Sequence, residues 1–167
     1  NDLKYFFNLK FLIIDCLRIK KHPSHFCLDD VIKLISILKP KKAILTKKAP
    51  LPIGPYNQAI NYENMLFVSG QIPLDPDSNE LINTGIEDET NQVMKNIQAI
   101  LTEAGMSFND IVKTSIFLKD MDNFKTVNET YGNYFEGVIP PARETVQVSK
   151  LPLDVNVEIS CIAIRNW

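Results

Sequence analysis

Hydrophobic and polar positions along residues 41–167 predict a mixed succession of strands and helices. Short apolar or alternating runs at residues 43–46, 56–60 and 65–70 predict three strands. Between the first two, a segment rich in proline and glycine at residues 50–55 predicts an extended turn.

The pattern then becomes helical over residues 87–104, where apolar positions share one face and acidic residues fill the first turn. Gly105 is a natural stop for this helix. A β-branched run at 111–118 predicts a strand, and a stripe of Phe124, Val127, Tyr131 and Phe135 predicts a second helix over 122–135. Closing strands are expected at 145–148 and 155–164.

The resulting order, βββαβαββ, predicts an α+β domain with a six-stranded mixed sheet and both helices on one face. Several strands are apolar on both sides, so the other face of the sheet also needs a cover. We expect oligomerisation to supply that cover. Residues 41–167 form the expected domain.

Residues 1–40 have a different composition and are assigned to an N-terminal extension. They contain no glycine, and a short amphipathic helix is expected near residues 31–38. A basic, hydrophobic extension is compatible with a leader for a mitochondrion or plastid-type organelle, or with a variable appendage without chemistry of its own. Without such a leader the expected location is the cytoplasm. No run approaches the length of about 20 apolar residues that a membrane span needs.

The charge balance and the lack of histidine limit the kinds of binding and catalysis that residues 41–167 can support. This part holds 11 Lys and Arg against 16 Asp and Glu, so it offers no basic stripe for a nucleic acid. Both histidines lie before residue 41, which removes Ser-His-Asp and Cys-His catalysis and His/Cys zinc sites from the domain. No metal or organic cofactor is expected. Cys161 alternates in phase with apolar neighbours and is expected to be a small core residue.

Two charged residues near the C-terminus are the main lead to function. Arg143 lies in a proline-bounded turn at 139–145, and Glu158 lies within the apolar strand at 155–160. A charge in a buried strand is costly unless it is paired or used. If both side chains meet at the mouth of one sheet, Arg143 can hold an anion while Glu158 handles a proton. The alternatives are a structural salt bridge for Arg143 and simple satisfaction of burial for Glu158.

An ordered set of motifs then identifies a family. The segments are Ile53-Gly54-Pro55-Tyr56-Asn57-Gln58-Ala59, Val68-Ser69-Gly70-Gln71-Ile72-Pro73, Asn96-Ile97 with Ala104-Gly105, Ile111-Val112-Lys113-Thr114, Phe117-Leu118-Lys119-Asp120, Phe124 with Val127-Asn128 and Tyr131, Pro141-Ala142-Arg143, Leu151-Pro152, and Val157-Glu158-Ile159 with Ala163. Together they resemble the RidA family of reactive-intermediate deaminases, also called the YjgF family or L-PSP endoribonucleases. Residues 1–40 have no counterpart in this pattern.

The resemblance implies a chorismate mutase-like fold, a homotrimer with active sites at subunit interfaces, and no cofactor. The implied reaction is hydrolysis of 2-imino acids, such as 2-iminobutanoate and 2-iminopropanoate, to 2-keto acids and ammonia. Arg143 would bind the carboxylate through two parallel hydrogen bonds, and Glu158 would orient water and shuttle protons.

Four further residues acquire substrate-binding roles from the same resemblance. Tyr56 and Asn128 would form hydrogen-bonding walls, Gly70 would let the substrate approach the backbone, and backbone groups near Thr145 would contact the imine nitrogen. Tyr56 as a packed core ring and Asn128 as a helix-surface residue remain alternatives. Ser69 has no suitable partner to act as a nucleophile and is expected to be a hydrogen-bonding residue at the end of a strand.

The chain also departs from the pattern in ways that bear on function. Thr145 stands where many relatives carry cysteine, and Glu144 is expected to face away from Arg143. The connection between Asn128 and Arg143 is about two residues shorter than usual. Two other functions stay open: an endoribonuclease acting on single-stranded RNA and inhibiting translation, which the acidic charge disfavours, and a trimer that binds small carboxylates without turnover.

Overall fold

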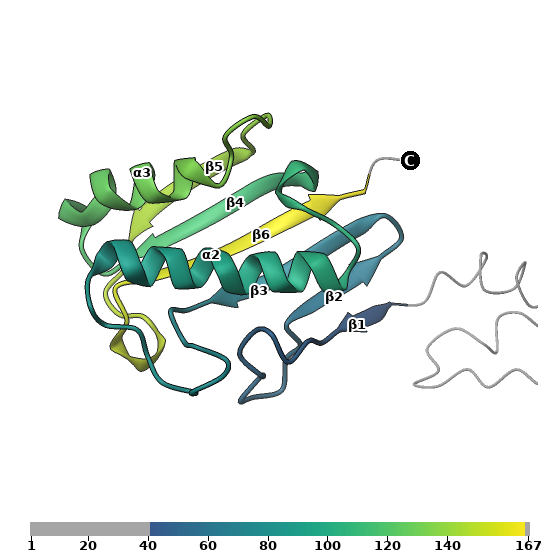
Figure 1. Ribbon diagram of the computed structural model, residues 1–167, viewed down its shortest axis with the longest axis horizontal. Coiled ribbons are helices and arrows are strands. Elements are labelled where there is room, and N and C mark those ends of the chain that lie inside the picture. Colours follow the sequence, from purple (N-terminus) through teal and green to yellow (C-terminus); the bar gives the residue numbers. More distant parts are fainter. Residues whose placement is uncertain (1–40, 166–167) are drawn as a thin grey trace, which may run out of the picture. The chain divides into compact units, whose positions relative to one another are not determined.

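The computed structural model describes residues 41–165, which form one six-stranded sheet with two α-helices on the same face (Figure 1). The strands are β1 (Lys42–Ile44), β2 (Ala59–Tyr62), β3 (Met65–Gln71), β4 (Ile111–Leu118), β5 (Ala142–Gln147) and β6 (Val157–Ile164). The helices are α2 (Ile86–Glu103) and α3 (Phe124–Asn133), and a 3₁₀ turn at Met121–Asn123 leads into α3. The predicted order βββαβαββ is confirmed. The expected extension, its helix and any leader lie outside the described residues.

The strands are arranged in the order β1-β2-β3-β6-β4-β5. Every neighbouring pair is antiparallel except β4 and β5, which are parallel and are joined through α3. The sheet is therefore mixed, as predicted. This order places β5, which carries Arg143, at an edge, whereas β6, which carries Glu158, lies in the interior of the sheet.

Helix α2 begins and ends where the sequence indicates. Three acidic residues, Glu87, Asp88 and Glu89, lie in its first turn, where the positive end of the helix dipole favours negative charge. At the other end Gly105 adopts a φ of 69°, and the amide of Met106 donates to the carbonyl of Leu101 at 2.8 Å. A positive φ is easily reached only by glycine, so this residue ends the helix with its last carbonyls satisfied.

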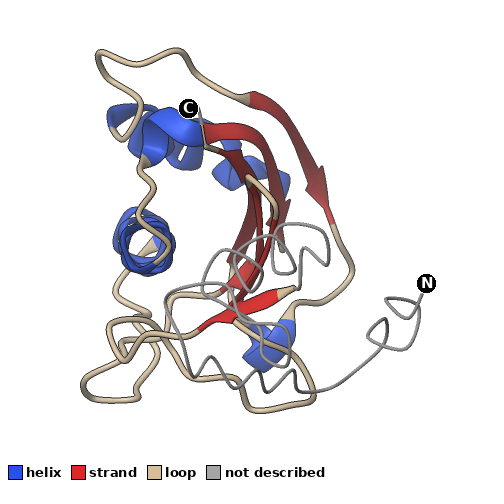
Figure 2. Cartoon of the chain, turned by 90° about the vertical axis from the view of Figure 1, so that its right-hand side faces the viewer, coloured by secondary structure: helices blue, strands red, loops and turns tan. Residues whose placement is uncertain are grey.

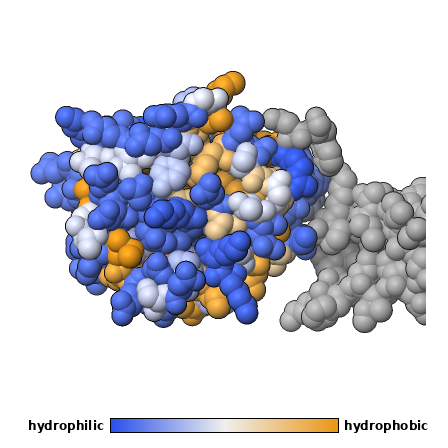
Figure 3. Space-filling view, in the orientation of Figure 1, coloured by the Kyte–Doolittle hydropathy of each residue, from blue (hydrophilic) through white to orange (hydrophobic). Residues whose placement is uncertain are grey.

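The two faces of the sheet differ, as strand β6 shows most clearly. Val157, Ile159, Cys161 and Ala163 are buried and point into the core beneath the helices, whereas the alternate positions are only partly buried. Figure 2 shows the strands curving around the helices on this covered side. Seen from that side, the surface is mainly hydrophilic with scattered apolar patches (Figure 3). Cys161 is 3% exposed and burial raises its thiol pKa to about 12, which confirms the expected core cysteine.

Two strand boundaries differ from the prediction and affect the site. Strand β2 begins at Ala59 rather than near Tyr56, and the buried Gln58 side chain just before it bonds the preceding loop. Its amide donates to the carbonyls of Thr46, Ala49 and Pro50 and accepts from the Thr46 amide, all within 2.7–3.0 Å. Strand β5 begins at Ala142, so Arg143 lies in a strand and not in a turn.

Candidate functional site

Arg143 is held on the helix-covered side of the edge strand β5. Its register partner in β4 is Thr114, whose hydroxyl bonds that of Tyr131 in α3 at 2.8 Å. The Arg143 guanidinium donates from Nη1 to Asn128 Oδ1 at 2.8 Å. Its central carbon lies 5.2 Å from the centroid of the Tyr131 ring and 5.8 Å from that of Phe124. Two aromatic faces and one amide therefore fix the direction of the guanidinium.

Within residues 41–165, Arg143 has no ion pair with a carboxylate. A guanidinium carries five N–H donors, and Asn128 accepts from one of its nitrogens, Nη1. The arginine borders a recess of about 460 Å³ whose other walls include Asn128, Pro140 and Pro141. The geometry thus leaves donors directed into an open recess, and the alternative of a structural salt bridge is not seen in this part of the chain.

Thr145 lies two residues further along β5 and therefore on the same side of the sheet as Arg143. Its register partner is the core residue Ile116. The Thr145 hydroxyl oxygen is buried and has no hydrogen-bond partner in the described residues. A buried hydroxyl without a partner is costly, so Thr145 contributes an unused polar group close to the arginine.

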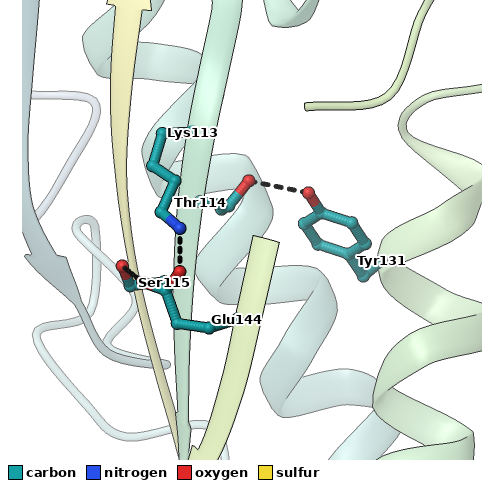
Figure 4. A network of polar contacts seen from close by, with 5 residues as sticks. All are labelled: Lys113, Thr114, Ser115, Tyr131 and Glu144. Atoms are coloured by element: carbon teal, nitrogen blue, oxygen red, sulfur yellow. Dashed lines mark hydrogen bonds and ion pairs between the residues drawn. The ribbon is translucent and has the colours of Figure 1, made fainter. Parts of the chain in front are cut away.

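Glu144 lies between these two residues and points to the opposite side of the sheet. Its carboxylate accepts from Lys113 Nζ and Ser115 Oγ of β4. Figure 4 shows this cluster on one side of β4, with the Thr114–Tyr131 bond on the other. The hydrogen bonds from Lys113 and then Ser115 lower the pKa of Glu144. As expected from strand alternation, Glu144 does not compete for Arg143.

Glu158 lies on the uncovered face of the sheet, opposite Phe117 of β4. It is partly buried, and this burial raises the pKa of its carboxyl group. The neighbouring strand β3 presents Gly70 to it: a β-carbon on Gly70 would lie 2.7 Å from Cδ of Glu158 and closer still to Oε1. The Glu158 carboxylate therefore occupies the space that any other residue at position 70 would fill.

Tyr56 lies in the loop before β2 and is 49% exposed, so it is not a packed core ring. Together with Gly70 it lines a second recess of about 230 Å³. Ser69 donates to the carbonyl of Asn57 at 2.7 Å, which confirms its expected role in bonding the end of the strand. Tyr56, Gly70 and Glu158 thus form one group, and Arg143, Asn128 and Thr145 form another.

The two groups lie on opposite faces of the sheet within one chain. Arg143 faces α3, where Asn128 accepts its hydrogen bond, whereas Glu158 alternates with the core residues Val157 and Ile159 and faces away from the helices. The hypothesis that a single sheet brings Arg143 and Glu158 together is therefore wrong for one protomer. The reason is register: the partner of Arg143 in β4 is Thr114, and that of Glu158 is Phe117, three residues on.

Sequence reasoning overlooked the aromatic residues that support Arg143. Phe124 and Tyr131 entered the prediction only as part of the stripe that indicates the second helix, whereas Phe124 is 39% exposed and lies beside the guanidinium. The signal was present in the spacing, because Asn128 lies four residues after Phe124 and three before Tyr131 on the same helix face. The buried amide of Gln58, which braces the loop before Tyr56, carried no such signal.

Among residues 41–165, no three His, Cys, Asp or Glu side chains gather closely enough to hold a metal ion. In the same range, neither helix is both long enough and apolar enough to cross a membrane.

Comparison with known proteins identifies the class. A six-stranded mixed sheet with two helices on one face is the architecture of solved YjgF and Rid-family structures. The chain belongs to the family described as endoribonuclease L-PSP, whose model matches residues 46–165.

Three similar proteins, two compared by sequence and one by structure, indicate what kind of protein this is. The chain is 51% identical to a RutC family protein of Pyrococcus horikoshii over 125 residues, which is 75% of this chain and 98% of the relative. It is 46% identical to the 2-iminobutanoate/2-iminopropanoate deaminase of Mus musculus, over 75% of this chain and 92% of the relative. The crystal structure of E. coli TdcF with bound serine superimposes with a TM-score of 0.73 at 40% identity, covering 75% of this chain and 99% of that one. These relatives support an enzyme of this family.

Proposed function

We propose that the protein hydrolyses 2-imino acids to 2-keto acids and ammonia. The observation that carries the proposal is Arg143, which is braced by Asn128 and two aromatic rings, has no carboxylate partner within residues 41–165 and borders an open recess. The name of the mouse relative supports this reaction, and the bound serine in TdcF is an amino acid that carries the same carboxylate as a 2-imino acid.

Arg143 binds the substrate carboxylate. A planar guanidinium can grip both carboxylate oxygens through two parallel N–H donors, which also fixes the plane of the adjacent imine carbon. Asn128 holds one guanidinium nitrogen and so sets the orientation of the remaining donors. Backbone groups near Thr145 lie on the same side of β5 and contact the imine nitrogen.

Glu158 directs the water. In its carboxylate form it accepts a proton from the water that adds to the C=N carbon, and the resulting carbinolamine then collapses to the ketone. During the addition Glu158 passes the proton of the water to the imine nitrogen. During the collapse it passes the carbinolamine hydroxyl proton to the same nitrogen, which leaves as ammonia, so the sum is one imine and one water giving one ketone and one ammonia. Its raised pKa brings donation and acceptance closer to neutral pH than for an ordinary glutamate.

The active site requires two protomers. Arg143 and Glu158 act on one substrate molecule only if a second chain brings its uncovered sheet face to the edge strand β5 of the first. The uncovered face carries Tyr62, Phe67 and Val146, each 41% exposed, and such an apolar surface favours burial in an interface. We infer a homotrimer with one site at each interface, as the family resemblance implies.

Variants of Arg143 test the assignment. Arg143→Ala should lower kcat/KM by about 30- to 1000-fold, and Arg143→Lys should lose most of the activity because a point charge cannot replace the bidentate fork. The assay measures keto acid or ammonia released from 2-iminobutanoate that a dehydratase generates in situ. Wild-type activity in Arg143→Ala would refute the assignment, and keto-acid binding by an inactive wild type would indicate a non-catalytic carboxylate-binding protein.

Ribonuclease activity is the alternative that the family description raises. Residues 41–165 contain no histidine, and the acidic side chains outnumber the basic ones. RNA cleavage by purified protein that disappears in Glu158→Gln, with the fold intact, would favour this alternative over imine hydrolysis.

A further inference from the structure

The recess beside Gly70 has walls that are mainly apolar. It measures about 230 Å³ and adjoins the strand position against which the Glu158 carboxylate rests. Its apolar walls come from four separate segments of the chain: Leu51, Ile53, Leu74, Leu81 and Leu153. Tyr56 borders the same recess.

The main polar residues that border this recess bond to the protein itself. The Gln58 amide makes four hydrogen bonds to backbone groups of the loop that precedes it. The Gln71 amide donates to the carbonyl of Ser69 at 3.1 Å. Apart from Asn79 and the Tyr56 hydroxyl, a ligand group in the recess therefore meets mainly aliphatic carbon, which favours an apolar occupant.

Leu153 is held in the wall of the recess at some energetic cost. Its backbone adopts φ 53° and ψ 18°, a left-handed conformation that disfavours residues other than glycine, asparagine and aspartate. Leu151 and Val155 on either side are buried at 6% and 5% exposure, and Lys119 pairs with Asp154 at 2.9 Å. These anchors hold the turn so that the Leu153 side chain projects outward, 56% exposed, at the recess.

We propose that this recess is a subsite for the side chain of the substrate, and that Leu153 is a specificity-determining residue selecting 2-imino acids with branched aliphatic side chains longer than ethyl. This inference rests on the proposed function. An aliphatic chain entering the recess covers Leu153 and the neighbouring leucines, so apolar surface leaves water on both partners. Gly70 both borders the recess and lies against the Glu158 side chain, so the recess and the proposed catalytic carboxylate share this one strand position.

The size of the recess agrees with such an occupant. At about 30 Å³ per water molecule, 230 Å³ corresponds to the space of several waters, which a four-carbon branched chain fills better than an ethyl group. In a closed pocket, one additional buried methylene changes the ratio of kcat/KM between two substrates by about 10- to 200-fold. Because Leu153 is half exposed, the lower end of that range applies.

The test compares two imines in Leu153→Asn. Asparagine is similar in size to leucine and tolerates the left-handed conformation, so the backbone is not perturbed. Imines are generated in situ from leucine and from 2-aminobutanoate by a flavin-dependent amino-acid oxidase, and hydrolysis is measured in competition with a semicarbazide trap. We expect kcat/KM to fall about 10-fold for the leucine-derived imine and less than about 3-fold for 2-iminobutanoate.

Leu45→Asn is the matched control, because Leu45 is 57% exposed and does not line the recess. It should leave the ratio of the two kcat/KM values unchanged. Calorimetric titration with 4-methyl-2-oxopentanoate and 2-oxobutanoate repeats the comparison without turnover. This titration tests the recess even if the wild-type protein hydrolyses neither imine, which would refute only the proposed function.

Two results would overturn the subsite. One is that Leu153→Asn lowers kcat/KM equally for the two imines, or lowers it for neither. The other is a change in the molar mass of the Leu153→Asn assembly, measured by light scattering, which would show that Leu153 packs against another protomer rather than against substrate.

Discussion

Replacing Gly70 with alanine should separate the catalytic role of Glu158 from the stability of the fold. The φ of Gly70 is not in the left-handed range, so alanine can adopt the same backbone. Its β-carbon, however, would lie 2.7 Å from Cδ and 3.1 Å from Cγ of Glu158. Carbon atoms pack favourably at about 3.5–4.0 Å, so the glutamate side chain must move by about 1 Å or more.

The cost to folding should be small because the displaced group is the far end of a flexible, partly exposed side chain. Moving it off its preferred rotamer costs about 0.5–1.5 kcal/mol. Alanine is itself favoured over glycine in a strand by about 0.5–1 kcal/mol, which offsets most of that cost. The free energy of unfolding should therefore change by less than about 1 kcal/mol. A displacement of about 1 Å in a catalytic group, by contrast, can lower the rate about 100-fold.

The assay is the release of keto acid from 2-iminobutanoate, with thermal denaturation measured on the same preparations. Gly132→Ala in α3 is a control for stability only: no atom lies within 4 Å of the added β-carbon, but the residue borders the recess beside Arg143. It should raise the free energy of unfolding by about 0.5–1 kcal/mol. Together the two variants separate the general effect of a glycine-to-alanine change from the clash at position 70.

A double-mutant cycle decides whether Gly70 acts through Glu158. In a Glu158→Gln background, Gly70→Ala should lower the rate of keto-acid release by less than about 3-fold, because the catalytic role of Glu158 has already been removed. Full activity in the single variant Gly70→Ala would refute the account. So would a 100-fold loss that persists in the Glu158→Gln background.

Two further predictions follow from buried polar groups. Burial raises the pKa of Glu158 above the ordinary value of 4.5, so its carboxylate is disfavoured in the fold, and relative stability falls as pH rises through the folded-state pKa. Glu158→Gln should consequently have a larger free energy of unfolding than wild type at pH 7, and this difference should vanish below about pH 4.5. The residual activity of this variant should lack the fall in kcat/KM at acidic pH. Equal denaturation curves for the two proteins at all pH values would contradict this prediction. Thr145→Val removes the buried, unpartnered hydroxyl while keeping its shape, and should raise the free energy of unfolding by about 1 kcal/mol. If only the backbone acts there, kcat/KM stays within about 3-fold, and a 10-fold loss would show that the hydroxyl binds substrate.

The sequence predicted the element order and the mixed sheet because both depend on local signals. Apolar periodicity located both helices, and Gly105 marked the end of α2. The predicted start of β2 was too early, because the loop before Ala59 is held by the buried Gln58 side chain, which no local pattern signals. The prediction also failed at β5, where prolines suggested a turn and Arg143 proved to be in a strand.

The candidate site was only partly accessible from sequence. The sequence identified Arg143 and Glu158 as candidates from their residue types. The face of the sheet on which each one lies, however, depends on the register between strands that are distant in sequence. Thr114 pairs with Arg143, and Phe117 pairs with Glu158, and this offset of three residues separates the two charges. No local pattern encodes such an offset, because it depends on how β4, β5 and β6 align in the folded sheet.

Subunit complementation tests most directly whether one site draws on two chains. Arg143→Ala and Glu158→Gln, each strongly impaired alone, are unfolded together and refolded as a mixture. If Arg143 of one protomer works with Glu158 of the next, random assembly restores intact sites at about one quarter of the interfaces, and activity returns to about that fraction of wild type. Mixed assemblies that form but stay inactive would contradict the shared site.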